Sequence, residues 1–113
     1  MEYQRADRVG DLLLELIAEL LTREIRDPRL HSITLTGVKV SKDLRHARVF
    51  FSVFGKAPDR AQASAGLSRA AGFIRAKIAE QLKLRFVPAI EFAYDETEEA
   101  AQRIDALLDG VKK

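Results

Sequence analysis

The alternation of apolar residues changes phase once within residues 33–40, and this change restricts the fold more than any other feature of the sequence. Apolar residues stand at odd positions up to Leu35 and at even positions from Val38 onward. Successive side chains of a β-strand point to opposite faces, so the apolar set cannot change face unless one extra residue is inserted. The slip falls at Thr36-Gly37. The sequence therefore predicts a β-bulge at Thr36-Gly37.

The bulge also determines how this strand pairs with the next one. A second strand is predicted from Ala47 to Phe54, after a turn at Asp43-Leu44. If the bulge absorbs one residue, four apolar pairs face each other across an antiparallel hairpin: Val40 with Ala47, Val38 with Val49, Leu35 with Phe51, and Ile33 with Val53. All eight side chains then lie on one face, which no bulge-free pairing achieves. The same register places Lys39 opposite Arg48 on the outer face.

Helical periodicity surrounds the hairpin. Residues 4–25 carry apolar side chains at i, i+3, i+4 and i+7, which predicts an amphipathic helix. Residues 58–84 are rich in Ala and apolar on one side, and we expect Gly72 to kink this helix or break it into two. Residues 90–94 alternate as a third strand, and Asp95 caps a last helix. This order predicts an α+β domain with a three-stranded sheet and helices packed on one face.

Length and composition describe one domain over residues 1–113. A chain of 113 residues with 47% hydrophobic content has room for one core and no second domain. It has no cysteine, which excludes disulfides and thiolate metal sites and fits a reducing cytoplasm. The N-terminus lacks the apolar stretch of a signal peptide, and no segment approaches the ~20 apolar residues of a membrane span. We therefore expect a cytoplasmic protein with no membrane partner.

Charge is distributed unevenly along the chain. Residues 31–85 hold eleven basic and three acidic side chains, a balance of +8, and both ends of the chain are acidic. Such a block indicates one basic surface and points towards a polyanion, although charge blocks are also common on soluble proteins with no such partner.

The sequence shows no residue pattern typical of an enzyme. His31 and His46 flank the hairpin without the spacing of metal ligands, and we expect both at the surface. The acidic residues at 95–99 stand at a predicted helix start, where the helix dipole favours negative charge. No glycine-rich phosphate loop follows a strand. We expect no catalysis, no cofactor and no bound metal.

Two groups of basic residues are candidate RNA contacts. The hairpin group consists of Lys39, Lys42, Arg45 and Arg48. A phosphate backbone would relieve the repulsion across its paired cations, but a solvated edge fits the pattern equally well. The helix group surrounds Gly72 and consists of Arg69, Arg75, Lys77, Lys83 and Arg85. A break at Gly72 would let a phosphate approach the backbone and would expose N–H groups at the next helix start, unless the break serves packing alone.

Four stretches resemble the signatures of the ribosome-binding factor A family: REIRDPRL at 23–30, TGVKVSKDLRHARV at 36–49, AAGFIR at 70–75 and RFVPAIEFAYDET at 85–97. The resemblance extends over nearly the whole chain. It implies a type II KH-like domain of order α-β-β-α-kink-α-β-α, which agrees with the order predicted above. KH domains usually carry a G-x-x-G loop, and this sequence has none. The family instead places Ala-x-Gly at the helix kink, matched here by Ala70-Ala71-Gly72, so the resemblance adds Ala70 and Gly72 to the RNA-contact candidates.

The resemblance further implies a non-catalytic protein that binds the 30S subunit and the 16S rRNA precursor late in assembly and supports maturation of the 16S rRNA 5′ end. We expect a monomer, with ribosome-assembly GTPases as further candidate partners. Two other classes remain open. A reader of duplex DNA needs base-reading side chains, whereas the basic helix here is rich in Ala. A protein-only adaptor needs an exposed apolar patch, for which the candidates are Phe50, Phe54 and Phe73.

Overall fold

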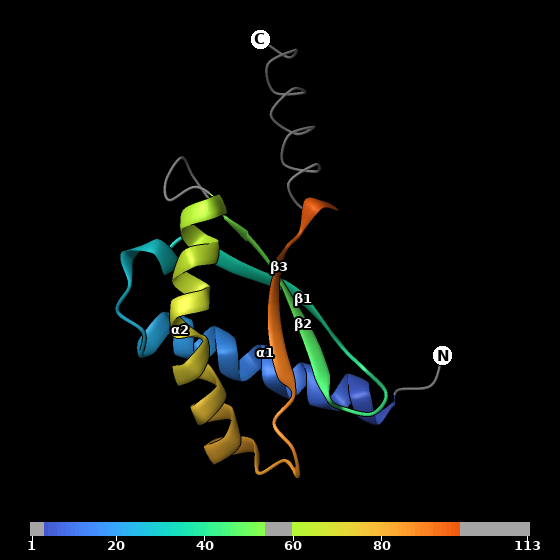
Figure 1. The fold of residues 1–113 in the computed structure, drawn as a ribbon. Helices are drawn as coiled ribbons and strands as arrows, with labels where there is room; N and C mark the ends of the chain where they lie inside the picture. The colour runs from blue at the N-terminus through green and yellow to red at the C-terminus, as the bar shows by residue number, and fades with distance from the viewer. Residues whose placement is uncertain (1–3, 54–59, 98–113) are drawn as a thin grey trace.

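The computed structural model describes residues 4–53 and 60–97. Figure 1 shows the elements in the order α1 (Arg5–Arg23), a short 3-10 helix η1 (Pro28–Leu30), β1 (Ile33–Val40), β2 (His46–Val53), α2 (Arg60–Leu82) and β3 (Ala89–Tyr94). β2 is the central strand of a three-stranded sheet, antiparallel to β1 and parallel to β3. A parallel pair needs a crossover connection, and α2 provides it. The order agrees with the predicted α+β, KH-like domain.

The predicted hairpin register is confirmed at every apolar pair. Leu35 pairs with Phe51 and Gly37 pairs with Phe50, so the ladder skips Thr36. The Thr36 hydroxyl donates a hydrogen bond of 2.6 Å to the Asp95 carboxylate, just beyond the end of β3. The bulge therefore lies where the period-2 pattern requires it, and its extra side chain connects β1 to β3. Lys39 and Arg48 are paired as predicted.

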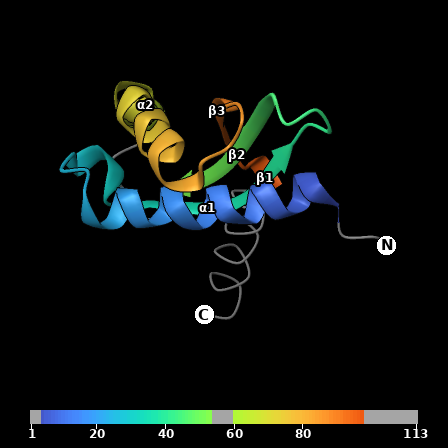
Figure 2. The same cartoon turned by 90° about the horizontal axis from the view of Figure 1, so that it is seen from below.

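Both helices cover the same face of the sheet. β2 buries Ala47, Val49 and Phe51 towards them, whereas its residues His46 and Arg48 are exposed. In Figure 2, α1 runs alongside β1, and α2 lies over the side of the sheet that ends in β3. The buried helix residues are Val9, Gly10, Leu13, Leu16, Ile17, Leu20 and Leu21 of α1 and Ala63, Gly66, Leu67, Ala70, Ile74 and Ile78 of α2.

α1 ends slightly earlier than the sequence predicts. The N–H groups of Glu24 and Ile25 both donate to the Leu20 carbonyl, each at 3.0 Å, and close the last turn. The next segment, η1, is capped by Asp27, whose carboxylate accepts a 3.0 Å hydrogen bond from the Arg29 N–H. Across the two described ranges, no helix has the length and apolar character needed to cross a membrane.

The break predicted at Gly72 is wrong, because α2 is one helix from Arg60 to Leu82. The cost of a mid-helix glycine, about 1 kcal/mol, is small beside the burial of Ala70 and Ile74 on its two sides. A bend without a break stays a prediction. The predicted last helix is described only at residues 96–97, which are helical; its remainder and the predicted helix start at Pro58 lie outside the described residues.

Candidate RNA-binding surface

The hairpin turn and the loop between α2 and β3 meet at one end of the sheet. The Ala89 N–H donates a hydrogen bond of 2.8 Å to the Arg45 carbonyl. The guanidinium carbon of Arg45 lies 5.5 Å from the centre of the Phe86 ring, and that of Arg85 lies 5.6 Å from it. Part of the hairpin group and the C-terminal part of the helix group therefore share one location.

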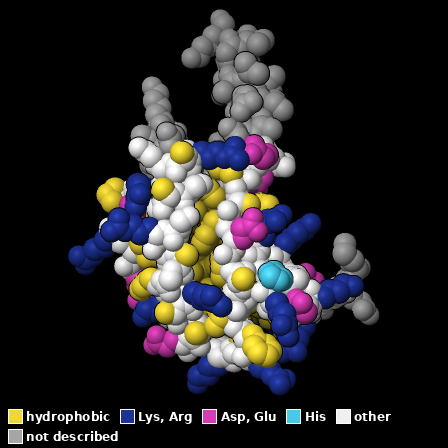
Figure 3. Space-filling model, in the orientation of Figure 1, with side chains coloured by type: hydrophobic (Ala, Val, Ile, Leu, Met, Phe, Trp, Pro, Cys, Tyr) yellow, Lys and Arg dark blue, Asp and Glu magenta, His cyan; other side chains and the backbone are white. Residues whose placement is uncertain are grey.

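We call this region the turn–loop surface and define it by Lys42, Arg45, Lys83, Arg85 and Phe86, all of which are exposed. Figure 3 shows the same feature: at the lower end of the visible face, Lys and Arg side chains surround an exposed hydrophobic patch. The Lys and Arg side chains of the turn–loop surface come from segments far apart in the sequence.

Hydrogen bonds within the hairpin turn hold its backbone in place. The Asp43 carboxylate accepts hydrogen bonds from the Ser41 hydroxyl at 2.6 Å and from the Arg45 N–H at 3.1 Å. These two hydrogen bonds favour the ionised carboxylate and lower the pKa of Asp43. Leu44 has φ 63°, a left-handed conformation uncommon for a non-glycine residue. The turn therefore presents Arg45 from a defined backbone.

The loop after α2 is also fixed at both ends. Lys83 follows the last helical residue with φ 48°, the left-handed conformation that commonly ends a helix. Pro88 is fully buried, and Leu84 and Val87 pack against the core. Because these anchors point inwards, the residues between them, Arg85 and Phe86, are left on the outside.

The outer face of the sheet carries a second cluster of charge. Arg48 lies between Lys39 of β1 and Glu91 of β3, and its guanidinium is 3.4 Å from the Glu91 carboxylate. Glu91 offsets the repulsion between the paired cations, so that repulsion gives no independent reason to expect a phosphate here. These residues and His46 line a shallow hollow of about 400 Å³ at the same end of the sheet as the turn–loop surface.

The remaining cations of the helix group lie along α2, and they differ in their surroundings. Arg69 and Arg75 are exposed. The Arg69 charge acts on the Asp27 carboxylate and contributes to its lowered pKa. Lys77 is half-buried; its ammonium lies 5.6 Å from the centre of the Phe73 ring and 4.0 Å from the Glu80 carboxylate. Lys77 is therefore less available to a phosphate than Arg75.

The two small residues of the helix group have different roles. Ala70 packs in the core, and its part in RNA contact stays a prediction. Gly72 is exposed, and a Cβ built on it would meet no atom within 4 Å. The interior N–H groups of a continuous helix are used by the helix itself, so the predicted free N–H donors do not arise here. What Gly72 offers instead is a bare backbone that another molecule can approach closely.

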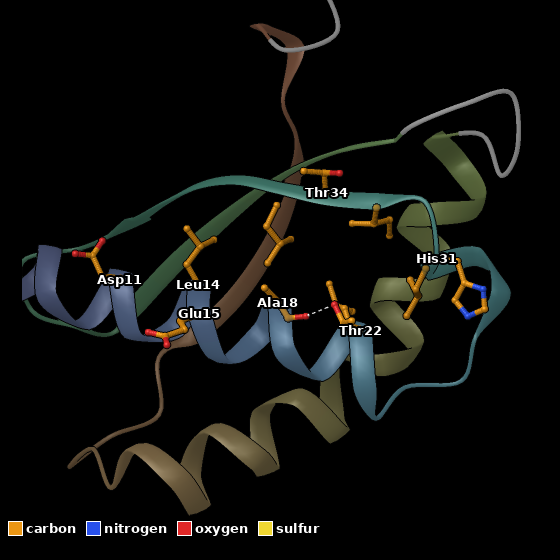
Figure 4. Close-up of a pocket in the computed structure, with 11 residues that line it drawn as sticks. Asp11, Leu14, Glu15, Ala18, Thr22, His31 and Thr34 are labelled. Atoms are coloured by element: carbon orange, nitrogen blue, oxygen red, sulfur yellow. Dashed lines mark hydrogen bonds between the residues drawn. The ribbon is translucent and has the colours of Figure 1, made fainter.

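A groove lined by acidic side chains lies between α1 and β1. Its volume is about 720 Å³, and Asp11, Glu15 and His31 line it together with apolar residues (Figure 4). Figure 4 also shows the hydrogen bond of 2.8 Å from the Thr22 hydroxyl to the Ala18 carbonyl on its floor. All of its lining residues lie in the described ranges, and none is Lys or Arg. The negative charge of this groove repels a phosphate backbone. The turn–loop surface is therefore the better candidate for RNA binding.

Sequence reasoning missed Phe86 and Glu91. An aromatic residue next to Arg85 in a loop is a signal that could have identified Phe86 as a site residue. The proximity of Phe86 to Arg45, however, depends on the parallel pairing of β2 with β3. Among the described residues, no three His, Asp or Glu side chains converge as metal ligands would.

The chain is similar to one characterised protein family over almost its whole length. The family model described as Ribosome-binding factor A matches residues 5–108. The ribosome-binding factor A of Thioalkalivibrio sulfidiphilus is 44% identical over 108 residues, covering 96% of this chain and 84% of the relative. That of Halothermothrix orenii is 45% identical over 113 residues, covering 100% of this chain and 93% of the relative.

Solved structures agree with these sequence matches. The crystal structure of ribosome-binding factor A from Thermus thermophilus superimposes with a TM-score of 0.71 at 28% identity, covering 79% of this chain and 93% of that one. The solution structure of a Thermotoga maritima protein proposed to be a ribosome-binding factor A gives 0.69 at 34% identity, covering 84% and 93%. A Thermus thermophilus homology model fitted into a map of a 30S complex gives 0.62 at 30% identity, covering 74% and 88%. With the family model matching residues 5–108, this chain belongs to the ribosome-binding factor A family.

Proposed function

We propose that this protein binds the 30S ribosomal subunit through 16S rRNA and its precursor, late in subunit assembly, and supports maturation of the 16S rRNA 5′ end without catalysing a reaction. The observation that carries the proposal is the turn–loop surface, where Arg45 and Arg85 lie over an exposed aromatic ring and Lys42 and Lys83 are exposed on the same two segments. Cations recognise a phosphate backbone by charge, and aromatic rings recognise unpaired bases by stacking.

The family supports the choice of RNA among polyanions. The Thermus thermophilus relative has been fitted into a map of its complex with the 30S subunit. The basic side chains here lie on loops and on an Ala-rich helix, an arrangement that suits phosphate contacts better than reading base pairs in a duplex. The protein is proposed to act in the cytoplasm as a monomer, with ribosome-assembly GTPases as partners in its release.

Co-sedimentation tests the proposal directly. Purified protein is mixed with 30S subunits, with 70S ribosomes and with a DNA duplex, and each mixture is centrifuged through sucrose. We expect the protein to pellet with 30S subunits and not with duplex DNA. The double variant R45A/R85A is expected to remain in the supernatant, and R23A is the matched control, because Arg23 lies on α1 and pairs with Glu19 at 3.7 Å. Equal pelleting of R45A/R85A and wild type would place the contact elsewhere.

The absence of catalysis needs its own test. Purified protein is incubated with the 16S rRNA precursor and Mg²⁺, and the 5′ end is mapped over time. We expect no cleavage by the protein alone. Magnesium-dependent cleavage that copurifies with the wild-type protein through successive columns would contradict this part of the proposal.

A further inference from the structure

Phe86 is exposed although its side chain is large and apolar. It is 56% exposed, more than Leu12 at 44% or Phe73 at 39%, which are the other large hydrophobic residues exposed in the described ranges. Phenylalanine is among the residues most often found inside proteins. Its neighbours Leu84, Val87 and Pro88 do turn inwards. The loop therefore turns Leu84, Val87 and Pro88 towards the core and leaves Arg85 and this ring outside.

Two arginines from different segments lie over the ring, each in a cation–π contact with it. The guanidinium carbons of Arg45 and Arg85 lie 5.5 Å and 5.6 Å from its centre. The capped hairpin turn holds Arg45, and the Ala89 hydrogen bond ties that turn to the loop. The backbone that carries the ring and its two cations is thus held in place before any ligand binds, which lowers the entropic cost of binding. A base that stacks on the ring would take the place of a guanidinium over its face.

An exposed aromatic ring next to two arginines restricts the chemistry of the ligand. An acidic peptide would satisfy the cations and leave the ring in water. An apolar protein surface would cover the ring and bury two arginines without partners, which is costly. A nucleotide that is not base-paired satisfies both, since its base stacks on an aromatic face and its phosphates contact the arginines. Bases inside a duplex are already stacked on both sides and cannot use such a ring.

We propose that Phe86 is a stacking platform for an unpaired RNA base, and that Arg45 and Arg85 bind the phosphates on either side of that base. This inference rests on the proposed function and adds to it a ligand class, single-stranded RNA rather than helical RNA.

Binding of transcribed 16S rRNA to Phe86 variants tests the platform at fixed salt. Stacking energies of aromatic residues predict that F86A loses affinity by about five- to 100-fold. F86L keeps an apolar side chain without an aromatic face and is expected to lose most of the same amount, whereas F86W is expected to bind like the wild type. Because no phosphate contact is removed, the salt dependence of F86L should equal that of the wild type. L12A is the matched control, since it removes an exposed apolar side chain from α1.

Tryptophan fluorescence reports the stacking itself. The sequence contains no Trp, so F86W and the control L12W each carry a single tryptophan. We expect a single-stranded oligoribonucleotide and 16S rRNA to quench F86W fluorescence, and a fully paired RNA of the same sequence to quench it much less. L12W fluorescence should not change with any of them.

Four results would overturn the platform. Wild-type affinity in F86L, with the wild type binding 16S rRNA, would refute it and leave the proposed function intact. Equal quenching of F86W by paired and single-stranded RNA would refute stacking on an unpaired base. If F86L lost affinity for 30S subunits but not for 16S rRNA, Phe86 would contact a ribosomal protein instead. Failure of the wild type to bind 16S rRNA or 30S subunits would refute the proposed function and the platform together.

Discussion

Gly66 of α2 lies against Leu30 of η1 so closely that a Cβ built on Gly66 would be 2.9 Å from the Leu30 Cδ2 atom and 3.3 Å from the Arg29 Cβ atom. Leu30 is 2% exposed, so its side chain has little room to move away. This contact is where the segment after α1 meets α2, and it allows the helix that carries the basic side chains to pack against the core.

Two glycine-to-alanine changes in α2 should therefore have opposite effects on stability. G72A adds a Cβ in open space and replaces a poor helix former, so it should raise the free energy of unfolding by up to about 1 kcal/mol. G66A gains the same propensity but overpacks the Leu30 contact, at a cost of about 1–3 kcal/mol, so its net effect should be destabilising. Urea denaturation of both variants measures the difference. A G66A variant at least as stable as G72A would contradict this account of the packing.

The stability of the protein should also fall in acid through Asp27. Hydrogen bonds from the Arg29 side chain at 2.7–3.2 Å, followed by the one from its backbone N–H, lower the pKa of Asp27 from 3.8 to about 2. Because the folded-state pKa is the lower one, the pair stabilises the fold above pH 4, and this contribution is lost as the pH falls from about 4 to about 2. Thermal unfolding of wild type and D27N at several pH values measures it: the two curves should differ at pH 6 and converge towards pH 2. R29K should reproduce part of the D27N effect, because lysine keeps the charge but not the two-pronged geometry.

Glu91 should stabilise the sheet modestly. Removing its charge in E91Q leaves Arg48 facing Lys39 without a compensating carboxylate. All three side chains are exposed, so the loss of stability should stay below about 1 kcal/mol. The double variant R48Q/E91Q removes the repulsion as well and should recover most of that loss. Urea denaturation at low and high salt measures both variants, and a loss in E91Q that does not shrink at high salt would show that Glu91 acts through packing.

The hairpin could be predicted from the sequence in detail because a period of two leaves one register that places all eight apolar side chains on one face of the sheet. The bulge at Thr36 follows from the slip between Leu35 and Val38 by counting alone. The stripe of α1 follows from its spacing as well, except that Leu12, which the same spacing includes, is exposed. These features depend on local periodicity, which the sequence contains in full.

The break predicted at Gly72 was wrong, and the predicted set of site residues was incomplete. Both have a different cause. Whether a glycine breaks a helix depends on what its neighbours bury, and Ala70 and Ile74 reach a core that only the folded chain defines. The proximity of Arg45 to Phe86 and of Arg48 to Glu91 requires the parallel pairing of β2 with β3. Such pairings join segments far apart in the sequence, and no local pattern specifies them.

The salt dependence of RNA binding should distinguish the turn–loop surface from the rest of α2. Each cation that neutralises one phosphate contributes roughly 0.7–0.9 to the slope of log affinity against log salt concentration. Arg45 and Arg85 lie on the turn–loop surface, so R45A and R85A should each weaken binding and flatten the slope by about that amount. K77A should change the slope less, because the Lys77 ammonium lies 4.0 Å from the Glu80 carboxylate. R75A separates the two regions, since Arg75 is exposed on α2 and remains a predicted contact.

R23A is the control for the change in net charge, because Arg23 is on α1 and pairs with Glu19. The measurement is a titration of 16S rRNA binding by filter retention between low and physiological salt for the wild type and each variant. If R45A and R85A keep the wild-type slope while R75A and K77A flatten it, phosphates bind along α2, and the turn–loop surface is not the main contact. If R45A, R85A, R75A and K77A all change the slope and R23A does not, the change caused by R85A is compared with the change caused by R75A. The larger change identifies the surface that contributes more to phosphate binding. We expect R85A to have the larger effect. Arg45 and Arg85 lie 5.5 Å and 5.6 Å from the centre of the same Phe86 ring, so we expect the two cations to contact one stretch of the RNA backbone.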